Sequence, residues 1–246
     1  MKNTDLTMGG AFGKRWEHYG VSKLDSLAIG NCTITNVPVK VGDESALNSD
    51  SQSTHLAGLF GTREMVLFGM VIDCGHQEIY VSPTGPNAGA SQQLGALLQS
   101  RGFTRIPLRR NRNKHFDVPA TINGRATQLI VDTGFFSTNL EKKFAIDAGV
   151  VPGSFGARRT TISDGALRRA ALNGMVKELK VGHFAMENVG VMLTPIHDWV
   201  LQSKVAGEAN AGLLGNEYLS LNFAVIDLGG MNLYLRPPDS GPAKKH

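Results

Sequence analysis

The residues best placed to do chemistry are Asp132, Thr133 and Gly134, which directly follow the apolar run Leu129–Val131. An apolar run that ends in an acid brings the carboxylate out of a low-dielectric surface, and a glycine two residues later lets the backbone turn sharply without covering it. A threonine between them can hydrogen-bond locally and stiffen the turn. The sequence therefore predicts a rigidly held carboxylate, as general acid–base catalysis requires.

A plainer interpretation of Asp132 is a turn carboxylate that caps a helix, which the apolar spacing predicts over residues 139–148. Two other acids, Asp73 and Asp227, also follow apolar runs and precede a glycine by two positions. Each lies just before an expected hairpin turn, where an acid usually has a structural role. We therefore expect neither of them to be catalytic.

The string Ile130–Gly134 resembles the catalytic signature of the retropepsin-like aspartic proteases, two apolar residues followed by Asp-Thr-Gly. That family also has an apolar-apolar-Gly string before a short helix, and Leu213–Gly215 with residues 216–221 is similar to it. The resemblance covers residues 103–237. It places the flap that covers the substrate at four residues: Ser163, Asp164, Gly165 and Ala166.

The resemblance implies a fold, a reaction and a partner. The fold is an all-β, retropepsin-like acid-protease barrel. The reaction is hydrolysis of a peptide bond in a peptide or protein substrate by water that a pair of aspartates activates, Asp132 being one of the pair. The two carboxyl groups share one proton because both cannot ionise at close range. Neither a metal nor an organic cofactor is implied.

Two features near the signature bear on the site. Thr138 matches a later Thr/Ser of the family pattern, so we assign it to the catalytic loop with Thr133 and Gly134. Phe135 and Phe136 stand where the family usually has alanine and a small polar residue. They either remove a hydrogen bond to the catalytic carboxyl or line a substrate pocket.

An internal repeat is the strongest organisational feature of the chain. Residues 57–83 and 211–237 align without a gap at an offset of 154, with 11 of 27 positions identical. Matching motifs at a constant spacing predict two copies of one unit. The second copy has a front half, about residues 103–159, whose counterpart in the first copy would precede Met1.

The repeat predicts four regions. These are an incomplete first copy from the flap onward at 1–83, a linker and short helix at 84–102, a complete copy at 103–237 and a tail at 238–246. Short apolar runs separated by turn residues predict a mostly β structure with little helix. The dipeptide Asn123-Gly124 predicts a tight hairpin.

The second aspartate then has three sources to consider. Two chains could form a homodimer that brings two Asp132 residues together, the natural product could be longer, or the two copies could form one unit with a single aspartate. The last case leads to the alternative function, a catalytically silent scaffold that binds peptides.

Composition excludes several other classes of protein. A net charge of +4 is too weak a bias to indicate nucleic-acid binding, and the basic run Arg109–Lys114 could hold a phosphate but is expected to be a solvated hairpin tip. No apolar run approaches the ~18 residues that a membrane span needs. Seven histidines and two cysteines show no metal-ligand spacing. The compartment stays open: cytoplasmic if the chain is complete, exported if an N-terminal signal has been removed.

Overall fold

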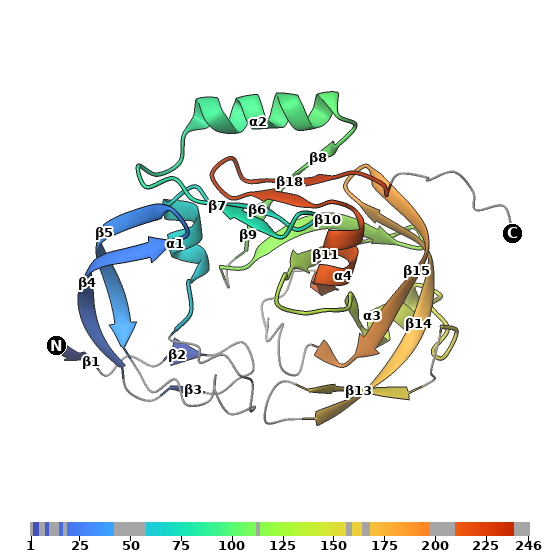
Figure 1. Ribbon diagram of the computed structural model, residues 1–246. Helices are drawn as coiled ribbons and strands as arrows, with labels where there is room; N and C mark the ends of the chain where they lie inside the picture. The colour runs from blue at the N-terminus through green and yellow to red at the C-terminus, as the bar shows by residue number, and fades with distance from the viewer. Residues whose placement is uncertain are drawn as a thin grey trace, which may run out of the picture.

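The computed structural model describes residues 2–4, 8–9, 15–16, 19–41, 58–111, 114–155, 159–163, 168–196 and 210–238 (Figure 1). The chain is mostly β within these residues, as the sequence predicts. The first part contains β1 (Lys2–Thr4), β2 (Met8–Gly9), β3 (Arg15–Trp16), β4 (Tyr19–Ile29), β5 (Cys32–Val41), α1 (Thr62–Leu67), β6 (Val71–Asp73) and β7 (Glu78–Tyr80). The second contains α2 (Ala88–Ser100), β8 (Thr104–Pro107), β9 (Arg109–Arg110), β10 (Phe116–Ile122), β11 (Arg125–Val131), β12 (Asn139–Glu141), α3 (Lys142–Asp147), β13 (Arg159–Ser163), β14 (Arg168–Val181), β15 (Phe184–Thr194), β16 (Asn210–Leu214), α4 (Asn216–Leu221), β17 (Val225–Asp227) and β18 (Asn232–Leu235).

Six strands of the second part close into a mixed barrel, in the order β14-β15-β12-β16-β11-β10 and back to β14. The β12–β15 and β11–β16 pairs are parallel and the other four are antiparallel. Closure leaves no free edge among the six strands. The barrel contains most of the largest apolar core, including Val118, Leu129 and Leu140, which are fully buried.

The hairpin that leads to the Asp-Thr-Gly string forms for a local reason. Asn123 and Gly124 have φ of +49° and +83°, the left-handed pair that a tight two-residue turn requires. The Asn123 side chain then joins the turn to its surroundings: its Nδ2 donates to the Ala148 carbonyl at 2.9 Å, and its Oδ1 accepts from the Lys177 and Glu178 amides. These contacts fix where β11 starts, and therefore where it ends.

β16 lies between β11 and β12 although it comes some 70 residues later in the chain. Ile130 and Val131 pair with Leu213 and Leu214 in parallel, and Leu140 pairs with Gly212 in antiparallel. The loop that joins β11 to β12 must therefore cross the end of β16. This crossing is what positions residues 132–138.

A five-stranded sheet, in the order β7-β6-β17-β18-β8, joins the two parts of the chain, and α2 lies along its outer face (Figure 1). At its centre β6 and β17 are antiparallel, and Ile72 lies opposite Ile226, which is its own counterpart at the 154 offset. The Cys74 amide donates to the Ala224 carbonyl at 2.8 Å, and the equivalent Leu228 amide donates to the Met70 carbonyl at 3.0 Å. This register has the symmetry of a local two-fold axis.

Other backbone details recur at nearly the same spacing. α1 and α4 occupy equivalent positions, and Gly61 and Gly215 cap them with similar extended angles, φ −79° and −80°. Residues with positive φ also come in matched pairs: Gly30 with Gly182, Asn36 with Asn188, Gly69 with Phe223, and Gln77 with Met231. This recurrence supports the repeat that the sequence predicts.

One of the expected helices differs from the structure. The helix predicted over residues 139–148 starts only at Lys142, because residues 139–141 form β12 between β15 and β16. The helix between the copies begins at Ala88, since Asn87 Oδ1 accepts from the Ala90 amide and caps it. Ser91 donates to Asp227 Oδ1 from inside α2.

Candidate active site

Asp132 directly follows β11, and its amide donates to the Leu214 carbonyl at 3.1 Å. Its carboxylate is partly buried, and Oδ1 accepts from the Gly134 amide at 2.9 Å and the Phe135 amide at 3.2 Å. A carboxylate that accepts backbone amides has a fixed orientation. In the described part of the chain Oδ2 makes no hydrogen bond to protein, so one oxygen is held and the other is left for a ligand.

The plainer interpretation, that Asp132 caps the following helix, is wrong. α3 is capped by Glu141, whose Oε1 accepts from the Lys143 amide. Asp132 therefore has a local role in its own loop and none at that helix.

The rest of the loop is clamped to the start of α4. The Asn216 and Glu217 amides donate to the carbonyls of Phe135 and Phe136, both at 2.7 Å. The Gly215 amide donates to Thr138 Oγ1 at 3.2 Å, and that threonine is buried. The first amides of a helix have no acceptor within the helix, so here the loop of residues 132–138 supplies one for each of the three. Asn216 and Glu217 contribute to the site through their amides, a role that the sequence analysis did not assign.

This crossing requires glycine at two positions. A Cβ on Gly215 would lie 2.6 Å from the Ser137 carbonyl oxygen and 2.7 Å from the Thr138 amide nitrogen. A Cβ on Gly212 would overlap the Asn139 carbonyl oxygen and touch Leu140 Cα at 3.0 Å. All of these are backbone atoms, which cannot move aside as a side chain can. The sequence signal was the string Ala211–Gly215, of which only the final glycine was assigned to the motif.

The two phenylalanines differ in position. Phe135 is half-buried against Ile130, Ile196 and Leu213, a small apolar cluster directly under the loop. Phe136 is 70% exposed. The carbonyls of both residues still accept hydrogen bonds from the first amides of α4. The loop backbone therefore keeps its contacts with α4 although both side chains are large.

The remaining loop and flap residues are only partly placed. Thr133 and Gly134 are exposed at the turn after Asp132. Ser163 ends β13, which pairs with β14 from Arg168 onward. Asp164, Gly165 and Ala166 lie outside the described residues.

The two other acids lie in hairpin turns, as expected. Asp73 accepts from the His76 amide and lies 2.9 Å from His76 Nδ1. Asp227 is buried and accepts from the Gly230 amide at 2.8 Å. Both therefore stabilise their own turns.

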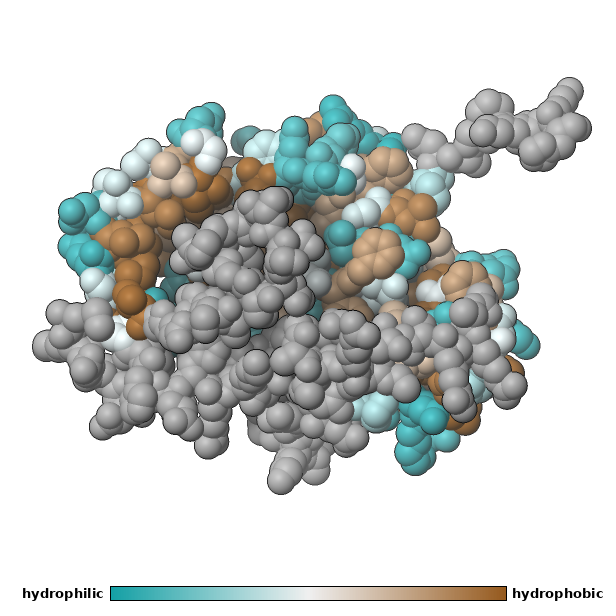
Figure 2. All heavy atoms as spheres, turned by 60° about the horizontal axis from the view of Figure 1, so that its bottom comes forward, coloured by the Kyte–Doolittle hydropathy of each residue, from teal (hydrophilic) through white to brown (hydrophobic). Residues whose placement is uncertain are grey.

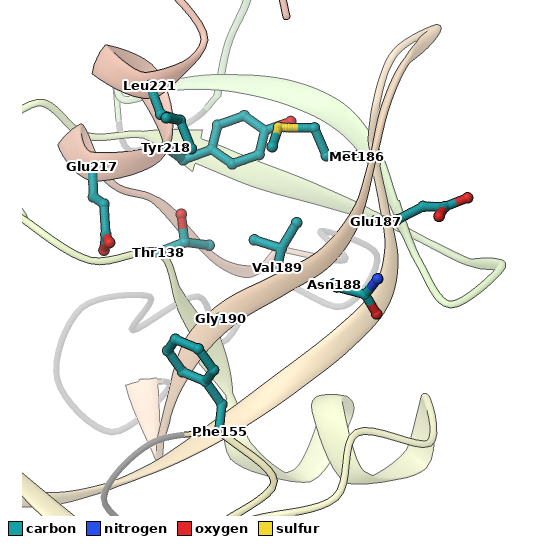
Figure 3. Close-up of a pocket in the computed structure, with 10 residues that line it drawn as sticks. All are labelled: Thr138, Phe155, Met186, Glu187, Asn188, Val189, Gly190, Glu217, Tyr218 and Leu221. Carbon is teal, nitrogen blue, oxygen red and sulfur yellow. The ribbon is translucent and has the colours of Figure 1, made fainter. Parts of the chain in front are cut away.

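A small pocket of about 140 Å³ opens behind the loop, between α4 and β15 (Figure 3). Thr138, Glu217 and Tyr218 line one side, and Phe155 covers Gly190 on the other. Burial raises the pKa of the Tyr218 hydroxyl. Asp132 is not among the lining residues, so this pocket is not where water would be activated.

Within the described residues no group of three or more His, Cys, Asp or Glu side chains is arranged to hold a metal ion. No helix in that part of the chain has the length and apolar character to cross a membrane.

Residues 118–218 match the model of the aspartyl protease family. An uncharacterised protein from the cobV 5′ region of a Sinorhizobium species is 25% identical over 124 residues, 50% of this chain and 48% of that protein. The chain thus spans about half the length of the curated relative it matches.

Two solved structures illustrate the structural likeness. The retropepsin-like aspartic protease from Rickettsia conorii is 21% identical, with 54% of this chain and 89% of that one covered and a TM-score of 0.36. The aspartic proteinase from Irpex lacteus is 13% identical, with 90% and 78% covered and a TM-score of 0.44.

The barrel with its clamped Asp-Thr-Gly loop is similar to an aspartyl protease domain, and residues 118–218 match the model of that family. Its fold is of the retropepsin-like type, as the sequence predicts.

Proposed function

We propose that this chain acts as an aspartic endopeptidase in which Asp132 is one of two catalytic carboxyl groups. The observation that carries the proposal is the Asp132 carboxylate, held through Oδ1 by two amides of a loop that is itself clamped to α4. The match to the family model supports the same reaction class.

The arrangement suits activation of water. An ionised carboxyl group removes a proton from water as it attacks the peptide carbonyl, and a protonated partner donates a hydrogen bond to the oxyanion that develops. Asp132 Oδ2 is the oxygen left for the water. Because one carboxyl of the pair must be protonated, we expect more activity at mildly acidic than at alkaline pH.

The second carboxyl group must come from a lobe that lies across β17 from Asp132, on the side where β6 is paired. A homodimer that pairs two chains through the sheet edge at β17 would have to displace β6, which already occupies that edge. The two-fold register across β6 and β17 instead supports an arrangement in which the first copy acts as the partner lobe. We therefore infer two copies in one bilobed unit, with the boundaries at 1–83, 84–102, 103–237 and 238–246, in which a front-half segment of the repeat docked on the first copy supplies the second aspartate.

The proposed substrate is a peptide or protein segment that lies across Asp132. Phe136 is exposed on the catalytic loop and offers an apolar surface to a substrate side chain. The expected flap residues, Ser163, Asp164, Gly165 and Ala166, would cover the bound peptide.

The test is cleavage of a mixed peptide library by the full chain and by its Asp132→Asn variant, read by mass spectrometry from pH 4 to 8. Asp73→Asn is the matched control, because Asp73 also follows an apolar strand but serves only its turn. We expect cleavage by the control and none by Asp132→Asn. Equal cleavage by the wild type and Asp132→Asn would refute the proposal.

The same samples decide between this function and the scaffold. A silent scaffold would bind library peptides equally in the wild type and in Asp132→Asn, with no turnover in either.

A further inference from the structure

The first copy leaves apolar surface uncovered that the second copy buries. Three pairs of counterparts show the difference: Leu24 is 40% exposed and Val176 0%, Leu59 67% and Leu213 2%, Ile79 56% and Leu233 0%. Figure 2 shows apolar surface on the side of the molecule that carries β4 and β5. Exposed apolar residues that gather on one face indicate an interaction site.

The strand edges of the first copy are open as well. In the second copy β18 pairs with β8, β15 with β12, and β14 with β10. Among the described residues, the counterparts β7, β5 and β4 pair only with β6, with each other, or with β1. An open strand edge presents unpaired amides and carbonyls that can accept another strand.

The start of α1 is also uncovered within the described residues, whereas the start of α4 is covered. The first three amides of α4 donate to the catalytic loop, whereas those of Gly61, Thr62 and Arg63 find no acceptor in the described part of the chain. A Cβ on Gly61 would meet only Glu64 Oε2, at 3.0 Å, where one on Gly215 would meet the loop backbone. The space that the loop fills beside α4 is therefore open beside α1.

We propose that this open face, formed by the β7 edge, the start of α1 and the side chains of Leu24, Leu59 and Ile79, is a docking surface for a front-half segment of the same repeat. The occupant has the strand pattern of residues 103–154. Its first strand pairs with β7 as β8 pairs with β18, which places the equivalent of Ile106 opposite Ile79.

The occupant follows from the match between the two halves. The open edges of β7, β5 and β4 correspond to edges that β8, β12 and β10 cover in the second copy. The open start of α1 corresponds to the start of α4, which residues 135–138 cover, and the axis at Ile72 and Ile226 relates the two positions. The segment also ends in an apolar-apolar-Asp-Thr-Gly loop. Resting on the proposed function, we assign to that loop the second catalytic aspartate.

The test joins a second copy of the chain's own residues 103–154 ahead of Met1, a length that restores the 154 spacing. Hydrogen exchange of the amides of residues 78–80 is compared with that of the original chain. We expect the outward-facing amides to exchange at least about tenfold more slowly, in a protein that stays monomeric. The control carries Ile106→Asp in the added segment only, which places a charge opposite Ile79 and should abolish the protection.

Unchanged exchange in a folded, duplicated protein overturns the proposal. The proposal is also overturned if the wild-type chain is already a dimer and its β7 amides are protected until Ile79→Lys exposes them. The occupant of the surface would then be a second copy of the chain. If the duplicated protein does not fold, the ¹⁵N-labelled full chain is titrated with the peptide Phe-Thr-Arg-Ile-Pro-Leu of residues 103–108. Amide shifts confined to β7 and its neighbours support docking, and shifts no different from those with a scrambled peptide refute it.

Peptide cleavage by the duplicated protein is read separately. Protected β7 amides without cleavage would refute the proposed function and leave the docking surface in place. Cleavage by the original chain, with no protection of β7 in the duplicated protein, would support the proposed function and refute the docking surface.

Discussion

Gly215→Ala tests whether the close crossing of the catalytic loop and β16 holds the site together. The new Cβ would overlap the Ser137 carbonyl carbon and lie 2.6 Å from its oxygen, so the loop must move by about 0.6 Å to bring even the nearest contact to 3.0 Å. Strain from overpacking typically costs about 1–3 kcal/mol. Weakening the Gly215–Thr138 hydrogen bond adds about 1 kcal/mol. We therefore expect a loss of about 2–4 kcal/mol in the free energy of unfolding, or roughly 5–15 °C in Tm for a chain of this size.

The repeat supplies a matched control in Gly61→Ala. Gly61 and Gly215 cap equivalent helices with nearly the same backbone angles, but a Cβ on Gly61 meets only the end of a flexible glutamate. Thermal unfolding of the two variants should differ by most of the predicted loss. Equal losses would show that glycine is needed for the helix cap alone, and the argument from close approach would fail.

Three further predictions concern single groups. Thr138→Val removes the acceptor for the Gly215 amide and should lower the free energy of unfolding in urea by about 1–3 kcal/mol, whereas Thr138→Ser should keep most of the wild-type value. An unchanged free energy of unfolding in Thr138→Val would contradict the clamp. Asn123→Ala removes three side-chain hydrogen bonds at a residue with positive φ, and should lower the free energy of unfolding by about 2–3 kcal/mol in the same assay. A decrease below about 0.5 kcal/mol would refute this account of the turn. Burial, with the nearby Asp73 charge, raises the pKa of the Cys74 thiol to about 11. Iodoacetamide at pH 8.5 should therefore modify Cys32 and spare Cys74 until the chain unfolds. Equal labelling of the two cysteines by mass spectrometry would contradict this prediction.

Local patterns in the sequence predicted the local parts of the fold. The Asn123-Gly124 turn was predicted because two left-handed residues in succession favour this dipeptide, and the strands on each side follow from it. β12 was missed because its three residues are a strand only through β15 and β16, which come much later in the chain. Helical periodicity over residues 139–148 could not reveal a partner some 50 to 70 residues away.

The candidate site shows the same division. Asp132 was identified from a contiguous string, and its position after a barrel strand agrees with that prediction. The clamp from the amides of residues 215–217 was missed, since a backbone amide carries no side-chain signature. The residues at the expected flap tip, Asp164–Ala166, remain a prediction because they lie outside the described part of the chain.

The β6–β17 pair also constrains how this protein can be made. Its central residues, Ile72 and Ile226, are separated by 154 positions, so the pair cannot form until the C-terminal end of the chain has been synthesised. At translation rates of 5–20 residues per second, β6 waits roughly 8–30 s for its partner. Non-local pairing of this kind slows folding and leaves apolar strands open to aggregation meanwhile. We therefore expect nascent chains that end before β17 to be the forms that molecular chaperones retain.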